Sequence, residues 1–203
     1  MEFTNDATLV FYKNAIGATQ DEFEQLIKRM PPRSERETIR VYMYTGPAPR
    51  TQKLFGEVDY NYSTLKLKAD PDIDPLVQRC IDFARGKYPE YEFNGALVNL
   101  YEDGKDSVGW HSDNEDSMVP GCPIVSISFG WTRLFKVRTV PKYWGNEKKN
   151  WDFLLENGDI IVMQGKDFQR ILQHAVPKVL RKIKQGEDTR RINITVRPFL
   201  KKM

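Results

Sequence analysis

Apolar residues recur with the spacing of an α-helix in two stretches of the N-terminal half. The first predicted helix follows Thr19, a residue type that caps helix N-termini, and ends before Pro31 and Pro32. The second covers about residues 74–88, with Pro75 in its first turn, where proline is tolerated. We expect the apolar residues of these helices to face a core: Phe23, Leu26, Ile27, Met30, Leu76, Val77, Cys80, Ile81 and Ala84.

From residue 93 onward the pattern changes to short β-rich runs that are separated by turn residues. Many short strands without intervening helices are typical of an antiparallel sandwich or jelly roll. Residues 33–63 also alternate apolar runs with turns, and they predict strands or a hairpin lying on something larger. The sequence therefore predicts one mainly β domain over residues 1–203 with two flanking helices and strands at 96–101, 123–130, 133–140, 151–156, 159–165 and 191–199.

The composition is that of an ordered globular chain, because 40% of its 203 residues are hydrophobic and 12% are aromatic. No apolar run approaches the roughly 18 residues of a membrane-spanning helix. The acidic N-terminus lacks the basic and apolar regions of a signal peptide. Cys80 and Cys122 are too few for a disulfide framework. We therefore expect an intracellular protein of a reducing compartment, with nucleus and cytoplasm not distinguished.

Charge is distributed unevenly along the chain. Residues 166–203 hold 11 lysines and arginines against 3 acidic residues, whereas the whole chain has a net charge of only +3. A polyanionic partner that approaches from one side explains this asymmetry. A solvated basic loop combined with buried arginines explains it equally well.

The chain contains two histidines, His111 and His174, so any histidine-dependent chemistry uses one or both of them. Asp113 follows His111 by two positions, and on an extended backbone the two side chains point to the same face. Two histidines and one carboxylate are the ligands of non-haem Fe(II) oxygenases, which keep adjacent coordination positions open. Zinc accepts the same ligands. Taken singly, His111 is better explained as a surface histidine and His174 as a hydrogen-bonded core histidine.

The last β-rich run places four polar side chains on one face of a strand: Arg191, Asn193, Thr195 and Arg197. Such a face is costly inside a β-barrel unless it meets an anion or an acid. Arginine pairs bidentately with carboxylates, so a dicarboxylate with one end on a metal would satisfy the arrangement. The alternative is an amphipathic edge strand with its polar face in water.

Several motifs in a fixed order resemble the AlkB family of Fe(II)/2-oxoglutarate dioxygenases, and in particular its eukaryotic-type DNA-repair members. They are N-x-Y, H-x-D-x-E, SISFG, GDIIVMQG, QHAVPK and R-x-N-x-T-x-R, and the resemblance covers roughly residues 40–200. It implies a double-stranded β-helix (jelly-roll) core over residues 93–200. Residues 1–92 would form an N-terminal helical support and a nucleotide-recognition lid.

The resemblance also implies roles for the residues named above. His111, Asp113 and His174 would bind Fe(II). Arg191 would hold the distal carboxylate of 2-oxoglutarate, and Arg197 would lie near its metal-chelating end. The same co-substrate would be contacted or enclosed by Asn99, Tyr101, Asn193 and Thr195.

Substrate contacts follow from the resemblance in two regions. Glu115 and the lid residues Arg50, Tyr60, Tyr62 and Ser63 would surround a flipped base, because a flat ring and a few polar groups suit such a base. Tyr42 would fill the gap left in the duplex. Core packing is the alternative for the three tyrosines. A loop after His174 would grip phosphates through Arg181, Lys182 and Lys184, or it is a solubilising loop.

The implied activity is oxidative removal of N-alkyl lesions such as 1-methyladenine and 3-methylcytosine from nucleic acid, with O₂ consumed and formaldehyde released. We expect alkylated DNA as the substrate of a monomer without membrane or protein partners. The alternatives are an RNA demethylase of the same family and a 2-oxoglutarate oxygenase that acts on a protein or a small molecule. A further alternative is a non-enzymatic β-domain that binds RNA or DNA.

Overall fold

The computed structural model of the protein describes residues 1–200 except for 5, 42, 63–64, 115–116 and 144–148. Among the predicted substrate residues, Tyr42, Ser63 and Glu115 lie outside the described residues, and so does the side chain of Tyr62. The other predicted site residues are described with their side chains.

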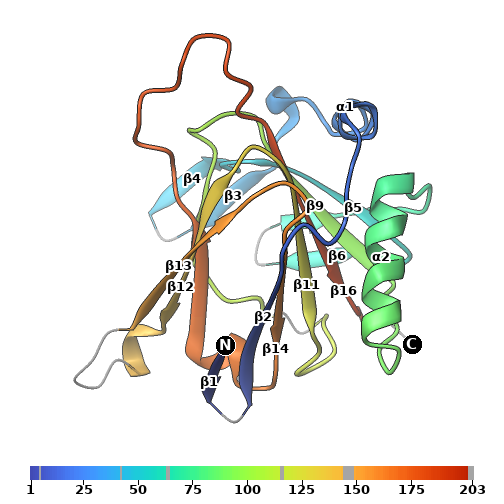
Figure 1. The fold of residues 1–203 in the computed structure, drawn as a ribbon, viewed down its shortest axis with the longest axis vertical. Coiled ribbons are helices and arrows are strands. Elements are labelled where there is room, and N and C mark those ends of the chain that lie inside the picture. The colour runs from blue at the N-terminus through green and yellow to red at the C-terminus, as the bar shows by residue number, and fades with distance from the viewer. Residues whose placement is uncertain (5, 42, 63–64, 115–116, 144–148, 201–203) are drawn as a thin grey trace.

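An eight-stranded sheet forms the larger layer of the fold (Figure 1). Its strands lie in the order β1 (Glu2–Thr4), β2 (Ala7–Tyr12), β14 (Ile160–Gln164), β11 (Ile124–Gly130), β16 (Arg191–Arg197), β9 (Gly95–Tyr101), β5 (Thr51–Gly56) and β8 (Ala69–Asp70). Neighbouring strands are antiparallel except for β5 and β8, which are parallel. The central strands β11, β16 and β9 are buried on both faces, because one face meets helices and the other meets the second sheet.

A four-stranded antiparallel sheet forms the second layer. Its order is β10 (Val108–His111), β15 (Leu172–Val176), β12 (Arg133–Thr139) and β13 (Asn150–Leu155). Apolar residues of both sheets share one cluster, in which Leu97 and Ile161 of the large sheet join Phe135, Val137 and Leu155 of the small one. Two facing, mainly antiparallel sheets confirm the predicted mainly β, jelly-roll core.

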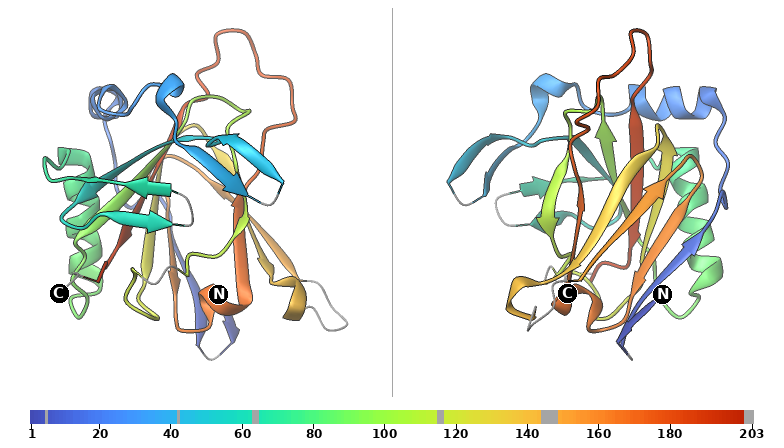
Figure 2. Two further views of the ribbon diagram at one scale, coloured as in Figure 1. Left: turned by 180° about the vertical axis from the view of Figure 1, so that it is seen from behind. Right: turned by 60° about the vertical axis from the view of Figure 1, so that its left-hand side comes forward.

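Two helices brace the outer face of the large sheet (Figure 2). The helices are α1 (Gln20–Lys28), α2 (Pro75–Lys87), the short α3 (Phe168–Ile171) and the 3₁₀ turns η1 (Arg33–Glu35) and η2 (Pro141–Tyr143). Thr19 and Glu22 form a capping box at the start of α1, and Asp74 caps α2 through the Leu76 N–H. Both long helices are therefore confirmed, whereas α3 is too short to show a periodic pattern. No helix in the described residues is both long and apolar enough to span a membrane.

The N-terminal half contributes more strands than its pattern predicts. Strand β2 pairs with β14, and β5 pairs with β9, so this half completes the large sheet. Ala7 and Leu9 are buried in one cluster while Val10 and Tyr12 pack partly buried against the other, so apolar residues on both sides hide the period-2 signal. Residues 33–63 begin two small hairpins, as expected from their turns: β3 (Thr38–Val41) with β4 (Tyr44–Pro47), and β6 (Tyr60–Tyr62) with β7 (Leu65–Leu67).

Candidate active site

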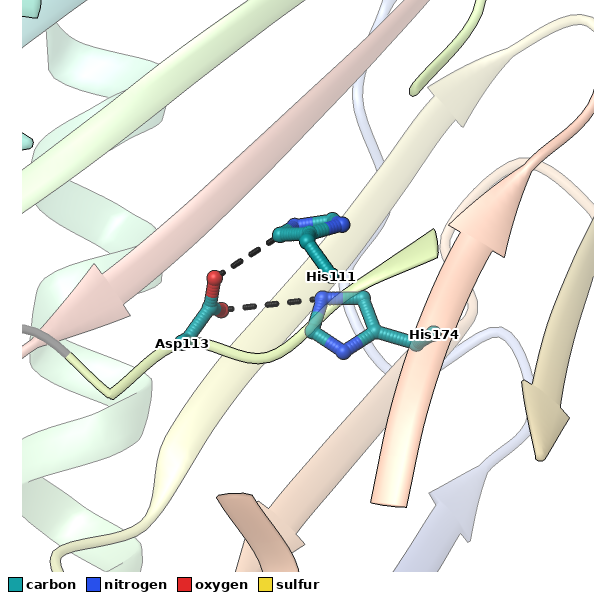
Figure 3. A group of neighbouring side chains, drawn as sticks. All are labelled: His111, Asp113 and His174. Carbon is teal, nitrogen blue, oxygen red and sulfur yellow. Dashed lines mark ion pairs between the residues drawn. The ribbon is translucent and has the colours of Figure 1, made fainter. Parts of the chain in front are cut away.

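Two strands of the small sheet bring both histidines together. His111 ends β10, and His174 lies directly opposite it on β15. Asp113 follows β10 by two residues, and its carboxylate faces both imidazoles from one side (Figure 3). One ligand atom from each of the three residues lies within 4.8 Å of the others. The spatial convergence on which an iron site depends is therefore present.

Hydrogen bonds around this cluster orient its ligand atoms. The Nε2 atoms of His111 and His174 lie 3.4 Å and 3.7 Å from the two Asp113 carboxylate oxygens. The Nδ1 atom of His111 lies 2.9 Å from the Gly109 carbonyl, so Nε2 is the atom presented to the cluster. Gln169 accepts the Asp113 backbone N–H at 2.8 Å and fixes the chain beyond the strand. Two imidazole nitrogens and a carboxylate oxygen thus point at one location.

The protonation states suit metal ligation. Burial alone raises the pKa of the Asp113 carboxyl, but Arg197 and the two histidines lower it more strongly, so its pKa lies well below the usual range. The positive charge of Arg197, whose Nη2 donates to Asp113 Oδ2 at 2.9 Å, has the largest of these opposing effects. Burial and the neighbouring His111 lower the pKa of His174 to about 3. At neutral pH, Asp113 is therefore ionised and His174 is neutral, as metal ligands must be.

A cavity of about 740 Å³ lies over the cluster, within the size range of small-molecule sites. Arg191 lies in its wall with the side chain fully buried, and its Nη2 donates to Ser128 Oγ at 2.9 Å. Its Nε and Nη1 atoms have no hydrogen-bond partner among the described residues. Burial lowers the pKa of Arg191 to about 10 but leaves it cationic at neutral pH. A buried guanidinium with unused donors requires an anionic ligand.

An amide-rich layer separates Arg191 from the metal cluster. The Asn193 side chain donates to Ser126 Oγ at 2.8 Å and accepts from Thr195 Oγ1 at 3.1 Å. Asn99 lies beside it and accepts from Arg50 Nε at 2.7 Å. The predicted polar face of β16 is therefore inside the molecule and lines the cavity; the alternative of an edge strand in water is wrong.

The predicted lid residues occupy different environments. Arg50 lines the cavity and is held by Asn99. Tyr60 also lines it, but the ring is buried, packs on Phe199 at 5.7 Å, and its hydroxyl accepts from Arg197 at 3.4 Å. Core packing and cavity lining therefore coexist at Tyr60. Ile39 and Arg40 of the β3–β4 hairpin complete this side of the cavity.

The basic loop (residues 177–190) connects β15 to β16 and projects beyond the ends of the strands (Figures 1 and 2). Arg181 pairs with Glu187 at 2.5 Å and stacks over Trp131, so its charge is already compensated. Lys182 and Lys184 are exposed, and in the described part of the chain neither forms an ion pair. Two of the C-terminal arginines, Arg191 and Arg197, are buried instead. Part of the excess positive charge of the C-terminal segment is therefore buried inside the protein and not displayed on its surface.

Other residues of the site escape prediction from the sequence. Ser126 and Ser128 alternate in the predicted SISFG strand, and that alternation could have placed them on the cavity face. Arg133, Gln169 and Asp106 carry no such signal, because their roles depend on partners that are distant in sequence.

The fold and the clustered site are those expected for the 2OG-Fe(II) oxygenase superfamily, and comparisons with known proteins agree. A sequence profile of the 2OG-Fe(II) oxygenase superfamily matches residues 9–197. The chain belongs to this superfamily and, within it, to the AlkB family, as the motif order predicts. The predicted cofactors, Fe(II) and 2-oxoglutarate, are those of the family.

Individual relatives refine this placement. The mouse alpha-ketoglutarate-dependent dioxygenase alkB homolog 3 is 35% identical over 164 residues, which are 76% of this chain and 54% of that protein. The human DNA oxidative demethylase ALKBH2 is 37% identical over 102 residues, 49% of this chain and 38% of that protein. The structure of OsALKBH1 shares the fold, with a TM-score of 0.58 at 18% identity over 97% of this chain and 98% of that one. The chain spans about half the length of the curated relatives that it matches.

Proposed function

We propose that this protein is an oxidative demethylase that removes N-alkyl lesions from nucleic acid, with alkylated DNA as the substrate. One observation carries the proposal: the His111–Asp113–His174 cluster faces a cavity whose buried wall presents the unused donors of Arg191. Such a cavity has a place for a metal and a place for an anion, as the two cofactors of the family require.

The three clustered side chains would hold Fe(II). Two neutral imidazoles and an ionised carboxylate are its preferred facial ligand set. Fe(II) held there would supply the chemistry for oxidation of an N-methyl carbon, with O₂ as oxidant and 2-oxoglutarate as co-substrate, and the hydroxylated methyl group would leave as formaldehyde. Arg197 maintains the charge of Asp113 and thereby its readiness to bind the metal.

The buried wall would hold 2-oxoglutarate. Arg191 would receive the distal carboxylate on its Nε and Nη1 donors, and the Tyr101 ring, 5.1 Å from its guanidinium carbon, supports it. Arg197 would lie at the metal-chelating end, since it contacts Asp113. The remaining lining that encloses the co-substrate would come from Asn99, Asn193 and Thr195.

The mouth of the cavity would receive a flipped base. Arg50, Tyr60 and the β3–β4 hairpin border it, and these elements would act as the N-terminal lid. Methylation of the pairing edge weakens base pairing, so bases such as 1-methyladenine and 3-methylcytosine flip at lower cost. The name of the human relative, DNA oxidative demethylase, supports DNA as the substrate. Roles for Tyr42, Tyr62, Ser63 and Glu115 remain predictions from the sequence.

Formaldehyde release tests the proposal directly. The protein is reconstituted anaerobically with Fe(II) and then given 2-oxoglutarate, O₂ and oligonucleotides that carry 1-methyladenine or 3-methylcytosine. The panel comprises single- and double-stranded DNA and RNA. We expect formaldehyde in proportion to succinate with methylated DNA. Preference for RNA would favour the RNA demethylase, and succinate without formaldehyde on every oligonucleotide would favour a protein or small-molecule substrate.

Neutralising the basic loop should weaken nucleic-acid binding in a salt-dependent manner. Lysines that neutralise phosphates release counterions, which steepens the fall of affinity with salt by about 0.7–0.9 per phosphate contact. We expect the double variant Lys182→Gln/Lys184→Gln to bind oligonucleotides more weakly and with a shallower salt slope. Adding Arg181→Gln should change little more, because Glu187 already pairs with Arg181.

Two exposed lysines on the helices provide the matched control for this loop. Lys28→Gln/Lys87→Gln removes the same charge from α1 and α2. Fluorescence anisotropy of labelled oligonucleotides at several salt concentrations compares the two double variants. An identical salt slope in both would exclude the basic loop from phosphate contact.

A further inference from the structure

Arg133 is a fully buried arginine at the start of β12, outside the predicted ligand set. Its guanidinium donates to three backbone carbonyls: Asp106 O at 2.8 Å, Pro177 O at 2.7 Å and Asp103 O at 3.4 Å. The guanidinium N–H groups therefore donate to main-chain oxygens and not to a carboxylate. A buried arginine is costly, so this bonding pattern calls for a reason.

The three carbonyls belong to segments that lead into the site. Asp103 and Asp106 lie in the connection between β9, which ends at Tyr101, and β10, which ends at His111. Pro177 directly follows β15, which carries His174. One side chain therefore ties together the connections to both histidine strands and to Tyr101.

The same guanidinium also packs on Tyr101. The Arg133 and Arg191 guanidinium carbons lie 5.4 Å and 5.1 Å from the Tyr101 ring centroid. Cation–π contacts of this length are attractive. Among the residues that the structure describes, neither arginine forms an ion pair with a carboxylate. Two buried cations around one ring make this wall positive, and the unused donors of Arg191 leave it open to an anionic ligand.

We propose that Arg133 is a positioning residue for the co-substrate: it holds Tyr101 and its flanking connections so that Arg191 presents its unused donors to the distal carboxylate of a dicarboxylate. This inference rests on the proposed co-substrate role of Arg191. Arg133 does not touch the ligand itself, since its donors are committed to main-chain carbonyls. It acts through the Tyr101 ring and through the second buried positive charge.

The test compares two 2-oxoacids that share the metal-chelating end. 2-Oxoglutarate and pyruvate are titrated by calorimetry into the protein loaded with Mn²⁺, and only 2-oxoglutarate has a distal carboxylate. We expect Arg133→Met to lower the affinity for 2-oxoglutarate about tenfold or more, because the loss of a supporting residue commonly has an effect of this size. The affinity for pyruvate should not change. Arg133→Lys keeps the charge but loses the planar guanidinium and its several donors. Its affinity for 2-oxoglutarate should lie between those of Arg133→Met and the parent protein.

Two further variants make the result interpretable. Lys136→Met removes a cation from the same strand, where it pairs with exposed Asp152, and should change neither affinity. Arg191→Met should abolish the preference for 2-oxoglutarate over pyruvate. The inference would be overturned if Arg133→Met and Arg133→Lys lowered the affinities for 2-oxoglutarate and pyruvate equally. An unchanged preference for 2-oxoglutarate over pyruvate in these variants would also overturn it. Failure of the proposed co-substrate site itself would be recognised differently, by an unchanged preference in Arg191→Met.

Discussion

Replacing His111 by alanine is expected to lower turnover more than 100-fold and to remove tightly bound iron. The reason is that a facial site has three protein ligands, and the loss of one leaves only Asp113 and His174. Residues that merely support a metal ligand already contribute about 10- to 100-fold to metal affinity or activity. With two histidines in the chain, no third imidazole is available to take the vacated position.

Iron content after anaerobic reconstitution, measured together with formaldehyde release, checks this expectation. Asp113→Asn should behave like His111→Ala, because an amide is a weak ligand and because Arg197 would lose its anionic partner. Asp152→Asn is the matched control, since it makes the same change in a half-exposed surface ion pair. Full iron occupancy together with normal turnover in His111→Ala would remove the metal-site assignment.

Asp106→Asn is expected to lower the free energy of unfolding by about 3 kcal/mol, as removal of one partner from a buried ion pair does. The Asp106 carboxylate is buried and accepts from Arg33, from Arg36 and from the Glu102 backbone N–H. The Arg36 side chain is only 5% exposed, so its charge cannot turn to water when the carboxylate is lost. Arg36 would keep its contacts with Glu102 and with the Thr51 hydroxyl.

The network of Asp106 also has a functional consequence. Arg33 and Arg36 precede the β3–β4 hairpin, while Asp106 lies in the connection that leads to His111. We therefore expect Asp106→Asn to loosen the hairpin side of the cavity as well. Urea unfolding measures the stability loss, and Asp152→Asn should lose at most about 1 kcal/mol as a surface pair. Equal losses in the two variants would contradict the buried network.

The elements that carry the site differ in how far they follow from the pattern of the chain. The two long helices are predictable because their caps and apolar spacing are local signals, as Thr19 and Asp74 show. Most strands from β9 onward follow from β-rich runs between turns, but β10 (Val108–His111) and β15 (Leu172–Val176) lie outside the predicted runs. Strand β2 is not predictable either, because both of its faces carry apolar residues and show no clean alternation with polar ones.

The residues of the site also differ in how much the sequence reveals about them. His111, Asp113, His174 and the polar face of β16 stand out in the sequence, since their residue types are few and their spacings are regular. The basic loop stands out too, but its charge does not reveal that Arg181 is occupied by Glu187. A charge count cannot separate a paired guanidinium from a solvated one.

The amino-acid sequence by itself determined which chemical groups this protein can use, together with its two long helices and most of its strands, because periodicity and capping act over a few residues. Only the tertiary structure decided which neighbours these groups have, how deeply they are buried and which charges lie beside them. The pairing of β10 with β15 sets the two imidazoles side by side, and burial beside Arg197 keeps Asp113 charged. Arg133 and Arg191 become one positive wall only because strands far apart in the chain meet at Tyr101.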